Sequence, residues 1–145
     1  MVVSINKKIV LLDVHAILHL AYHSLPGFAS SKGEPTGGLY GVSAFVIKIM
    51  GELRPDYIIA CYDLPTPTFR KKLYAEYKAG RKKPDEELVA QMIRSRDIFK
   101  AFNIPIYEKP GFEADDMLGT IAEQVKKENN FQVIIASGDL DTLKL

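Results

Sequence analysis

Three carboxylates fall within four residues of this chain, at Glu113, Asp115 and Asp116. They follow a Pro-Gly turn and precede an apolar pattern of helical spacing that includes Leu118 and Val125. Acidic side chains favour the first turn of a helix, because they cap free backbone N–H groups and interact well with the helix dipole. Three acids exceed what capping needs, and their mutual repulsion is costly unless a positive charge lies among them. The stretch predicts either an ordinary helix start or part of a cation site, and the other carboxylates decide between the two.

The elements around this stretch alternate between two apolar patterns. Short apolar runs without polar alternation are typical of strands buried on both faces of a parallel sheet. The predicted strands span residues 8–13, 56–62, 104–107 and 131–136. The predicted helices span residues 15–24, 39–53 and 84–102, and a fourth runs from the acidic stretch to about residue 129. This alternation predicts an α/β fold, a doubly wound, mostly parallel sheet with helices on both faces.

Acidic residues follow each of the four predicted strands. Because ligands bind such sheets beyond the carboxyl ends of the strands, these acids are expected to share one cleft. The seven carboxylates are those of Asp13, Asp63, Glu113, Asp115, Asp116, Asp139 and Asp141. They could not all stay ionised there unaided, and their oxygens suit Mg²⁺ or Mn²⁺. Two such ions about 4 Å apart can activate a water and stabilise an in-line displacement at phosphorus.

Other metal chemistry and other compartments are less well supported. His15, His19 and His23 are spaced four residues apart on one predicted helix face, but the acid of the helical zinc signature is missing between them. We interpret them as a partly exposed or core-facing set. The single cysteine, Cys61, lies in a predicted strand, which excludes an internal disulfide and fits a reducing, cytoplasmic setting. No apolar run is long enough to cross a membrane.

A basic segment follows the second predicted strand. Between residues 69 and 83, seven basic side chains accompany one acid, although the whole chain has a net charge of only +1. Residues 70–77 are predicted to form a short helix, and Lys78 and Arg81 share a face if the helix extends to them. Two tyrosines within the segment could stack on unpaired bases. A solvated charged loop is the alternative, but beside a carboxylate cleft the segment predicts contact with nucleic acid.

Six motifs, in order along the chain, are those of a known family. They are Leu11–His15, Gly33–Thr36 with Tyr40-Gly41, Tyr62–Arg70, Tyr74–Arg81, Pro110–Asp116 and Ser137–Asp141. With them the chain resembles the amino-terminal half of the 5′-nuclease domain of bacterial DNA polymerase I, in the flap endonuclease superfamily. The resemblance implies a PIN-like fold and a divalent-metal-dependent 5′-3′ exonuclease and flap endonuclease. It also implies a monomer that acts on 5′-flap, nicked or primer-bearing DNA during replication and repair.

The resemblance also assigns roles to residues. The seven acids match the family's metal-binding acids, which are expected to hold two ions of Mg²⁺ or Mn²⁺. Lys78 and Arg81 match residues that act at the cut, and Tyr77 grips the nucleotide beside them. The nucleic-acid contacts expected in full are Arg70, Lys71, Tyr77, Lys78, Arg81 and Lys82.

The chain departs from the family pattern in three respects. Val14 stands where the family has Gly, and His19-Leu20 stands where it has Tyr-Arg. Residues 1–145 are expected to be the N-terminal portion of the domain, without its helix-hairpin-helix part, two further metal-binding acids or the polymerase. We therefore expect weak or absent activity from this chain alone. Two alternatives remain open, a PIN-type single-strand ribonuclease and a non-catalytic nucleic-acid-binding fragment.

Overall fold

A parallel sheet forms the centre of the molecule. The computed structural model describes residues 6–64, 68–80, 83, 85–128 and 130–137. These residues build a four-stranded sheet of order β3-β2-β1-β4, with every neighbouring pair parallel. The strands are β1 (Lys7–Asp13), β2 (Tyr57–Cys61), β3 (Ile106–Tyr107) and β4 (Phe131–Ala136).

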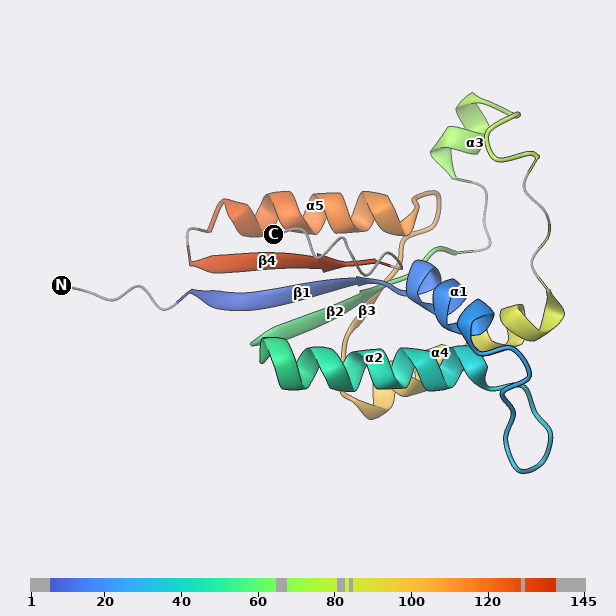
Figure 1. Ribbon diagram of the computed structural model, residues 1–145. Helices are drawn as coiled ribbons and strands as arrows, with labels where there is room; N and C mark the ends of the chain where they lie inside the picture. Colours follow the sequence, from blue (N-terminus) through green and yellow to red (C-terminus); the bar gives the residue numbers. More distant parts are fainter. Residues whose placement is uncertain (1–5, 65–67, 81–82, 84, 129, 138–145) are drawn as a thin grey trace.

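The register brings the strand ends level with one another. Asp13 of β1 is paired with Cys61 of β2, and Leu12 with Ala136 of β4. The carboxyl ends of these strands therefore lie along one edge of the sheet, which we call the rim. In Figure 1 the rim is at the right-hand ends of the arrows, where α1 (Val14–Ser24) begins directly after β1.

Helices cover both faces of the sheet. Together with α1, α2 (Gly37–Leu53) and α4 (Glu86–Ala101) pack on one face, and α5 (Ala114–Lys126) packs on the other (Figure 1). The alternation along β1 explains both layers, because Val10 and Leu12 join the three-helix cluster while Ile9 and Leu11 join the cluster under α5. The predicted doubly wound α/β fold is confirmed.

Two predicted elements are shorter than expected. The helix predicted over 70–77 is α3 (Phe69–Leu73), and the chain is extended at Tyr74. The side chain of Thr68 caps the start of α3, but none of its residues is buried, so no packing carries the helix further. β3 contains only two of the four predicted residues, since Pro105 has no N–H group to donate to the sheet.

The ends of the other helices also differ from the prediction, and α2 begins at Gly37, two residues earlier than expected. α4 begins at Glu86 with Asp85 as its N-cap, two residues later than expected, and Pro84 lies outside the described residues. α5 ends at Lys126 rather than near residue 129. Within the described ranges, no helix has the length and apolar character needed to cross a membrane.

Candidate active site

Two acids of the rim come from neighbouring strands. Asp13 ends β1, and its Oδ1 accepts the N–H of Ala16 at 3.3 Å, so that it also caps α1. Asp63 follows β2, and its Oδ1 accepts the N–H of Ala114 in the first turn of α5. Its Oδ2 lies 3.8 Å from Nδ1 of His15 on α1. Asp63 thus ties the end of β2 to the starts of two helices.

The other described acids gather at the start of α5. Glu113 is the N-cap of α5 and is only 8% exposed. Its N–H donates to Oδ2 of Asp116 at 2.9 Å. Asp115, in the same turn, is exposed and lines an open hollow that Asp13 and Ser137 also line. The acidic stretch is therefore a helix start, as the first alternative predicts, and it faces the ends of β1 and β2.

The carboxylates of the rim influence one another. Burial raises the pKa of Asp13 from 3.8 to about 6, and the charges of Asp115 and Asp63 add to the rise. The N–H of Ala16 and the ammonium of Lys78 act in the opposite direction. Ionised Asp13 is therefore costly, chiefly because it is partly buried and to a lesser extent because other acids lie near it.

The donor set suits a hard divalent cation, although the described acids do not enclose one. Every candidate ligand is a carboxylate oxygen, and a cation would relieve the excess charge at Asp13. In the part of the chain that the structure describes, however, no three Asp, Glu, His or Cys side chains lie close enough to hold an ion as they stand. Asp139 and Asp141 lie outside that part. The structure brings five of the seven predicted acids to one rim without assembling a closed site.

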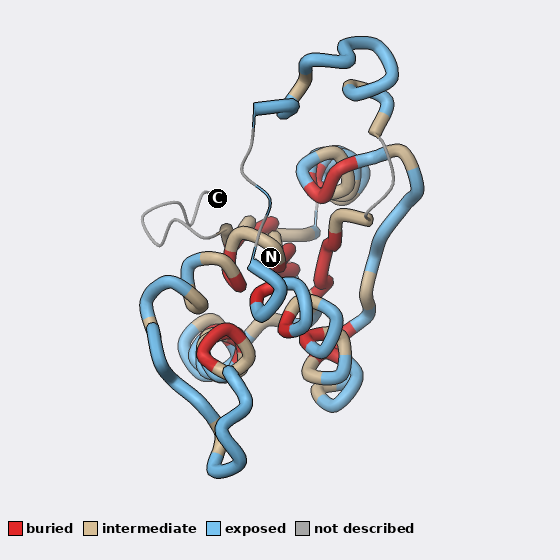
Figure 2. The backbone as a smooth tube through the Cα atoms, turned by 90° about the vertical axis from the view of Figure 1, so that its right-hand side faces the viewer, coloured by how far each residue is buried: buried red, intermediate tan, exposed pale blue. Residues whose placement is uncertain are grey.

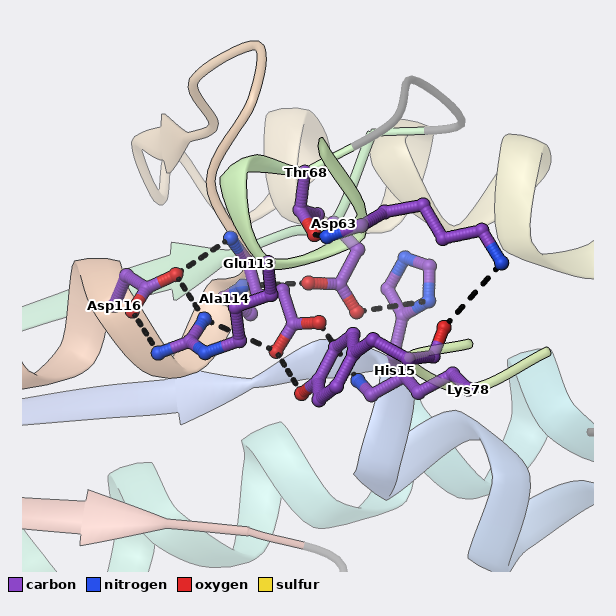
Figure 3. A network of polar contacts seen from close by, with 10 residues as sticks. His15, Asp63, Thr68, Lys78, Glu113, Ala114 and Asp116 are labelled. Atoms are coloured by element: carbon purple, nitrogen blue, oxygen red, sulfur yellow. Dashed lines mark hydrogen bonds and ion pairs between the residues drawn. The ribbon is translucent and has the colours of Figure 1, made fainter. Parts of the chain in front are cut away.

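The basic segment, residues 69–80 in the described chain, lies over the rim (Figure 3). Nζ of Lys78 is 2.8 Å from Oε1 of Glu113, and the hydroxyl of Tyr77 donates to Oε2 at 3.4 Å. Lys78 lies in a turn with a φ of 58°, so the helix does not extend to it as the shared face with Arg81 would require. Arg81 and Lys82 lie outside the described residues.

Two further residues predicted to contact nucleic acid, Arg70 and Lys71, also make bonds within the protein. The guanidinium of Arg70 makes two parallel bonds of 2.8 Å to the carboxylate of Asp116, and a nitrogen of it lies 3.5 Å from Oε2 of Glu113. The hydrogen bonds from Arg70 lower the pKa of Asp116. Nζ of Lys71 donates to the carbonyl of Ala75 at 2.6 Å, which holds the turn after α3.

His15 is a residue of the rim that sequence reasoning did not assign. Besides its approach to Asp63, its ring meets the ring of Tyr62 edge-on at 5.8 Å. Burial lowers the pKa of His15, although the Asp63 carboxylate raises it. His15, His19 and His23 line one cavity of about 760 Å³ between α1 and α4. The sequence could have indicated this role, because His15 stands two residues after Asp13. A helix that starts at an acid at the end of a strand has its first turn at the rim.

Comparison with known proteins agrees with this geometry. The fold is that of the α/β proteins whose sites lie beyond the carboxyl ends of parallel strands. Residues 8–145 match the family model of the 5′-3′ exonuclease, N-terminal resolvase-like domain, and the chain belongs to this family. It is 43% identical over 139 residues to a DNA polymerase I of Chloroflexus aurantiacus, covering 94% of this chain and 14% of that protein. It is 35% identical over 139 residues to a 5′-3′ exonuclease of Aquifex aeolicus, covering 96% of this chain and 48% of that protein.

Solved structures support the fold. The T5 D15 protein co-crystallised with metal ions aligns with a TM-score of 0.63 at 21% identity, over 96% of this chain and 52% of that one. The T5 D15 flap endonuclease in a complex with DNA and metal ions aligns with a TM-score of 0.60 at 17% identity, over 92% and 50%. The present chain thus spans about half of these structures and a seventh of the polymerase.

Proposed function

We propose that this chain is the N-terminal part of a divalent-metal-dependent 5′-3′ exonuclease and flap endonuclease that hydrolyses phosphodiester bonds in DNA. The observation that carries the proposal is the meeting of Asp13, Asp63 and Glu113 at one rim beneath a segment that carries Lys78. Membership of the exonuclease family supports the reaction. The T5 flap endonuclease solved with DNA and metal ions supports the substrate and the cofactor by analogy.

The proposed cofactor is a pair of Mg²⁺ or Mn²⁺ ions. Asp13, Asp63, Glu113 and Asp115 would hold mainly the first, with Asp116 beside them. Asp139 and Asp141 would help to hold the second. Bound ions of this kind supply an activated water and stabilise the charge that develops on the phosphate.

The basic segment supplies the remaining chemistry. Lys78 and Arg81 balance negative charge on the phosphate at the cut, and Tyr77 stacks on an unpaired base. Lys71 and Lys82 add positive charge along the strand, which strengthens binding without regard to sequence. The substrates proposed are 5′-flap, nicked and primer-bearing DNA in replication and repair, bound by a cytoplasmic monomer.

The test compares Asp13→Asn with the unchanged chain. Asn keeps the cap of α1 but removes the charge, so the variant should fold normally and still bind 5′-flap DNA. With Mg²⁺ or Mn²⁺ present, slow cleavage of labelled flap DNA by the unchanged chain should fall at least about 100-fold in the variant. Glu123→Gln, an exposed acid later in α5, is the matched control and should cleave normally.

Three results would contradict the proposal. Equal cleavage by Asp13→Asn would remove the rim from the chemistry, and strong preference for an RNA hairpin would favour a single-strand ribonuclease. Binding of flap DNA that no divalent ion converts into cleavage, even in a chain extended beyond Leu145, would leave a non-catalytic binding module.

A further inference from the structure

We propose that Arg70 is a positioning residue rather than a phosphate contact. It fixes the root of the basic segment, Phe69 and Arg70, to the start of α5. The tip of the segment, Tyr77 and Lys78, then moves between Glu113 and the nucleic acid. This inference rests on the proposed function and specifies how its basic segment works.

The pairing of Arg70 with Asp116 has the geometry of an anchor. Two guanidinium nitrogens donate in parallel to the two oxygens of one carboxylate, each at 2.8 Å. Such a planar, bidentate, charge-assisted pair fixes orientation as well as distance. Oδ2 of Asp116 also accepts the N–H of Glu113, so the pair is built into the first turn of α5. A bidentate phosphate contact through the same two nitrogens would require Arg70 to leave this arrangement.

Further contacts hold the root in the same place. The N–H of Phe69 donates to the carbonyl of Gly111 at 2.8 Å, just before α5. The ring of Phe69 lies 5.6 Å from that of Phe112, and the guanidinium of Arg70 lies over Phe69 at 4.5 Å. Carboxylate, guanidinium and two rings thus form a continuous contact between α3 and the start of α5.

The tip is held differently. Its backbone bonds are local, from Tyr77 N–H to the carbonyl of Tyr74 and from Ala79 N–H to that of Glu76. It reaches Glu113 by an ammonium contact from Lys78 (Figure 3). The hydroxyl of Tyr77 makes a longer contact with the same carboxylate. Lys side chains make point contacts on a flexible stem, unlike the rigid fork of Arg.

Glu113 is one of the carboxylates assigned to the cation, so an ion bound there would compete with the protein contacts of Glu113, of which the one from Lys78 is the shortest. Its Oε1 cannot serve Lys78 and a divalent ion equally well. With an ion on Glu113, Lys78 could contact a phosphate instead, while the bidentate bond between Arg70 and Asp116 would keep the root in place.

The salt dependence of DNA affinity separates the two roles. When the logarithm of DNA affinity is plotted against the logarithm of salt concentration, each phosphate contact contributes about one unit to the slope. Lys78→Ala should reduce this slope by about one unit, whereas Arg70→Ala should leave the slope unchanged while weakening binding at every salt concentration. The probe is 5′-flap DNA in Ca²⁺, a divalent ion that also prefers oxygen ligands.

Limited digestion with chymotrypsin provides a readout that does not need DNA. Arg70→Ala should increase cleavage after Leu73, Tyr74 and Tyr77 several-fold, because the root is released. Asp116→Asn should do the same, and the double variant should be no worse than either single one. Arg70→Lys keeps the charge but not the fork, so it should not restore protection. Lys78→Ala, which leaves the root intact, is the control: cleavage after Leu73 and Tyr74 should stay as in the unchanged chain, and only cleavage after Tyr77 should rise.

The outcomes are distinguishable. A slope reduced by one unit in Arg70→Ala, with digestion unchanged, would overturn the proposal and make Arg70 a phosphate contact. Additive effects of Arg70→Ala and Asp116→Asn would also overturn it. If the chain does not bind flap DNA at all, the proposed function fails while digestion still decides the role of Arg70. If Arg70→Ala does not fold, Arg70→Lys and Asp116→Asn carry the same comparison.

Discussion

The rim and the basic segment are both rich in charge, but different forces hold them. The rim acids stand at the ends of strands and the starts of helices, directly above fully buried residues such as Leu12, Val14 and Tyr62. The basic segment has no buried side chain in α3, and Leu73 and Tyr74 are 73% and 74% exposed. Figure 2 shows this contrast, with buried residues at the centre of the molecule and mostly exposed residues along the basic segment.

This difference explains how each region can contribute to one reaction. Burial of the apolar residues beneath the rim stabilises the fold by more than the repulsion between the acids destabilises it. The acids are therefore held close together before any cation binds. The side chain of Lys78 is about one third exposed and makes a point contact on a flexible stem, so the tip of the segment can exchange one anionic partner for another. A rigid acidic rim beneath a basic segment that can move suits a substrate that is itself a polyanion.

The same substitution made on both sides of this comparison should have very different effects. Leu18 of α1 is fully buried, and Leu18→Ala should lower the free energy of unfolding by about 3 kcal/mol. Leu73→Ala in the segment should change it by less than about 0.5 kcal/mol. Urea denaturation followed by circular dichroism measures both values. Equal losses would show that the segment belongs to the packed core.

The charge at Asp13 should be a measurable cost to the fold. Because its folded-state pKa is raised to about 6, the native state binds a proton that the unfolded state has released. Stability without metal should therefore fall as pH rises from about 4 to about 6, and Asp13→Asn should be more stable by ~2 kcal/mol at about pH 7.5. The two proteins should be equally stable below about pH 3, where Asp13 is neutral in both states.

Divalent cations provide the control for this prediction. Mg²⁺ should raise the melting temperature of the unchanged chain more than that of Asp13→Asn, because ligands that bind only the folded state stabilise it. A variant that is less stable than the unchanged chain at neutral pH would show that Asp13 is satisfied without a cation.

Raising the salt concentration should also affect the basic segment more than the rim, with a smaller effect than the substitutions above. Raising NaCl from about 50 mM to about 500 mM shortens the screening length, which weakens the contacts of Arg70 and Lys78 with the rim. Chymotryptic cleavage within the basic segment should rise about two- to fivefold, while the melting temperature changes little. An unstructured peptide digested under both conditions corrects for the response of the protease. Unchanged cleavage would mean that apolar contacts, and not charge, hold the segment.

The sequence predicted the sheet and its rim better than the basic segment. An apolar run such as 131–136 is stable as a strand buried on both faces of a parallel sheet. An acid that directly follows such a strand then lies at the rim. The early end of α3 was not predictable in this way, since no burial pattern in 69–80 sets where the helix stops. Nor does any local signal pair Arg70 with Asp116, which lies 46 residues away. Asp139 and Asp141 are outside the described residues, so their place stays a prediction.

Asp13 and Asp63 carry charge and also bond to the starts of helices, which affects the choice of substitution for inactivating the site. Each accepts a backbone N–H in the first turn of a helix, α1 for Asp13 and α5 for Asp63. Replacing either with Ala would confound a missing ligand with a frayed helix, and a loss of activity could then be read in two ways. Asp115 is exposed in the first turn of α5, so an amide there offers the cleanest inactive protein for trapping an uncut substrate.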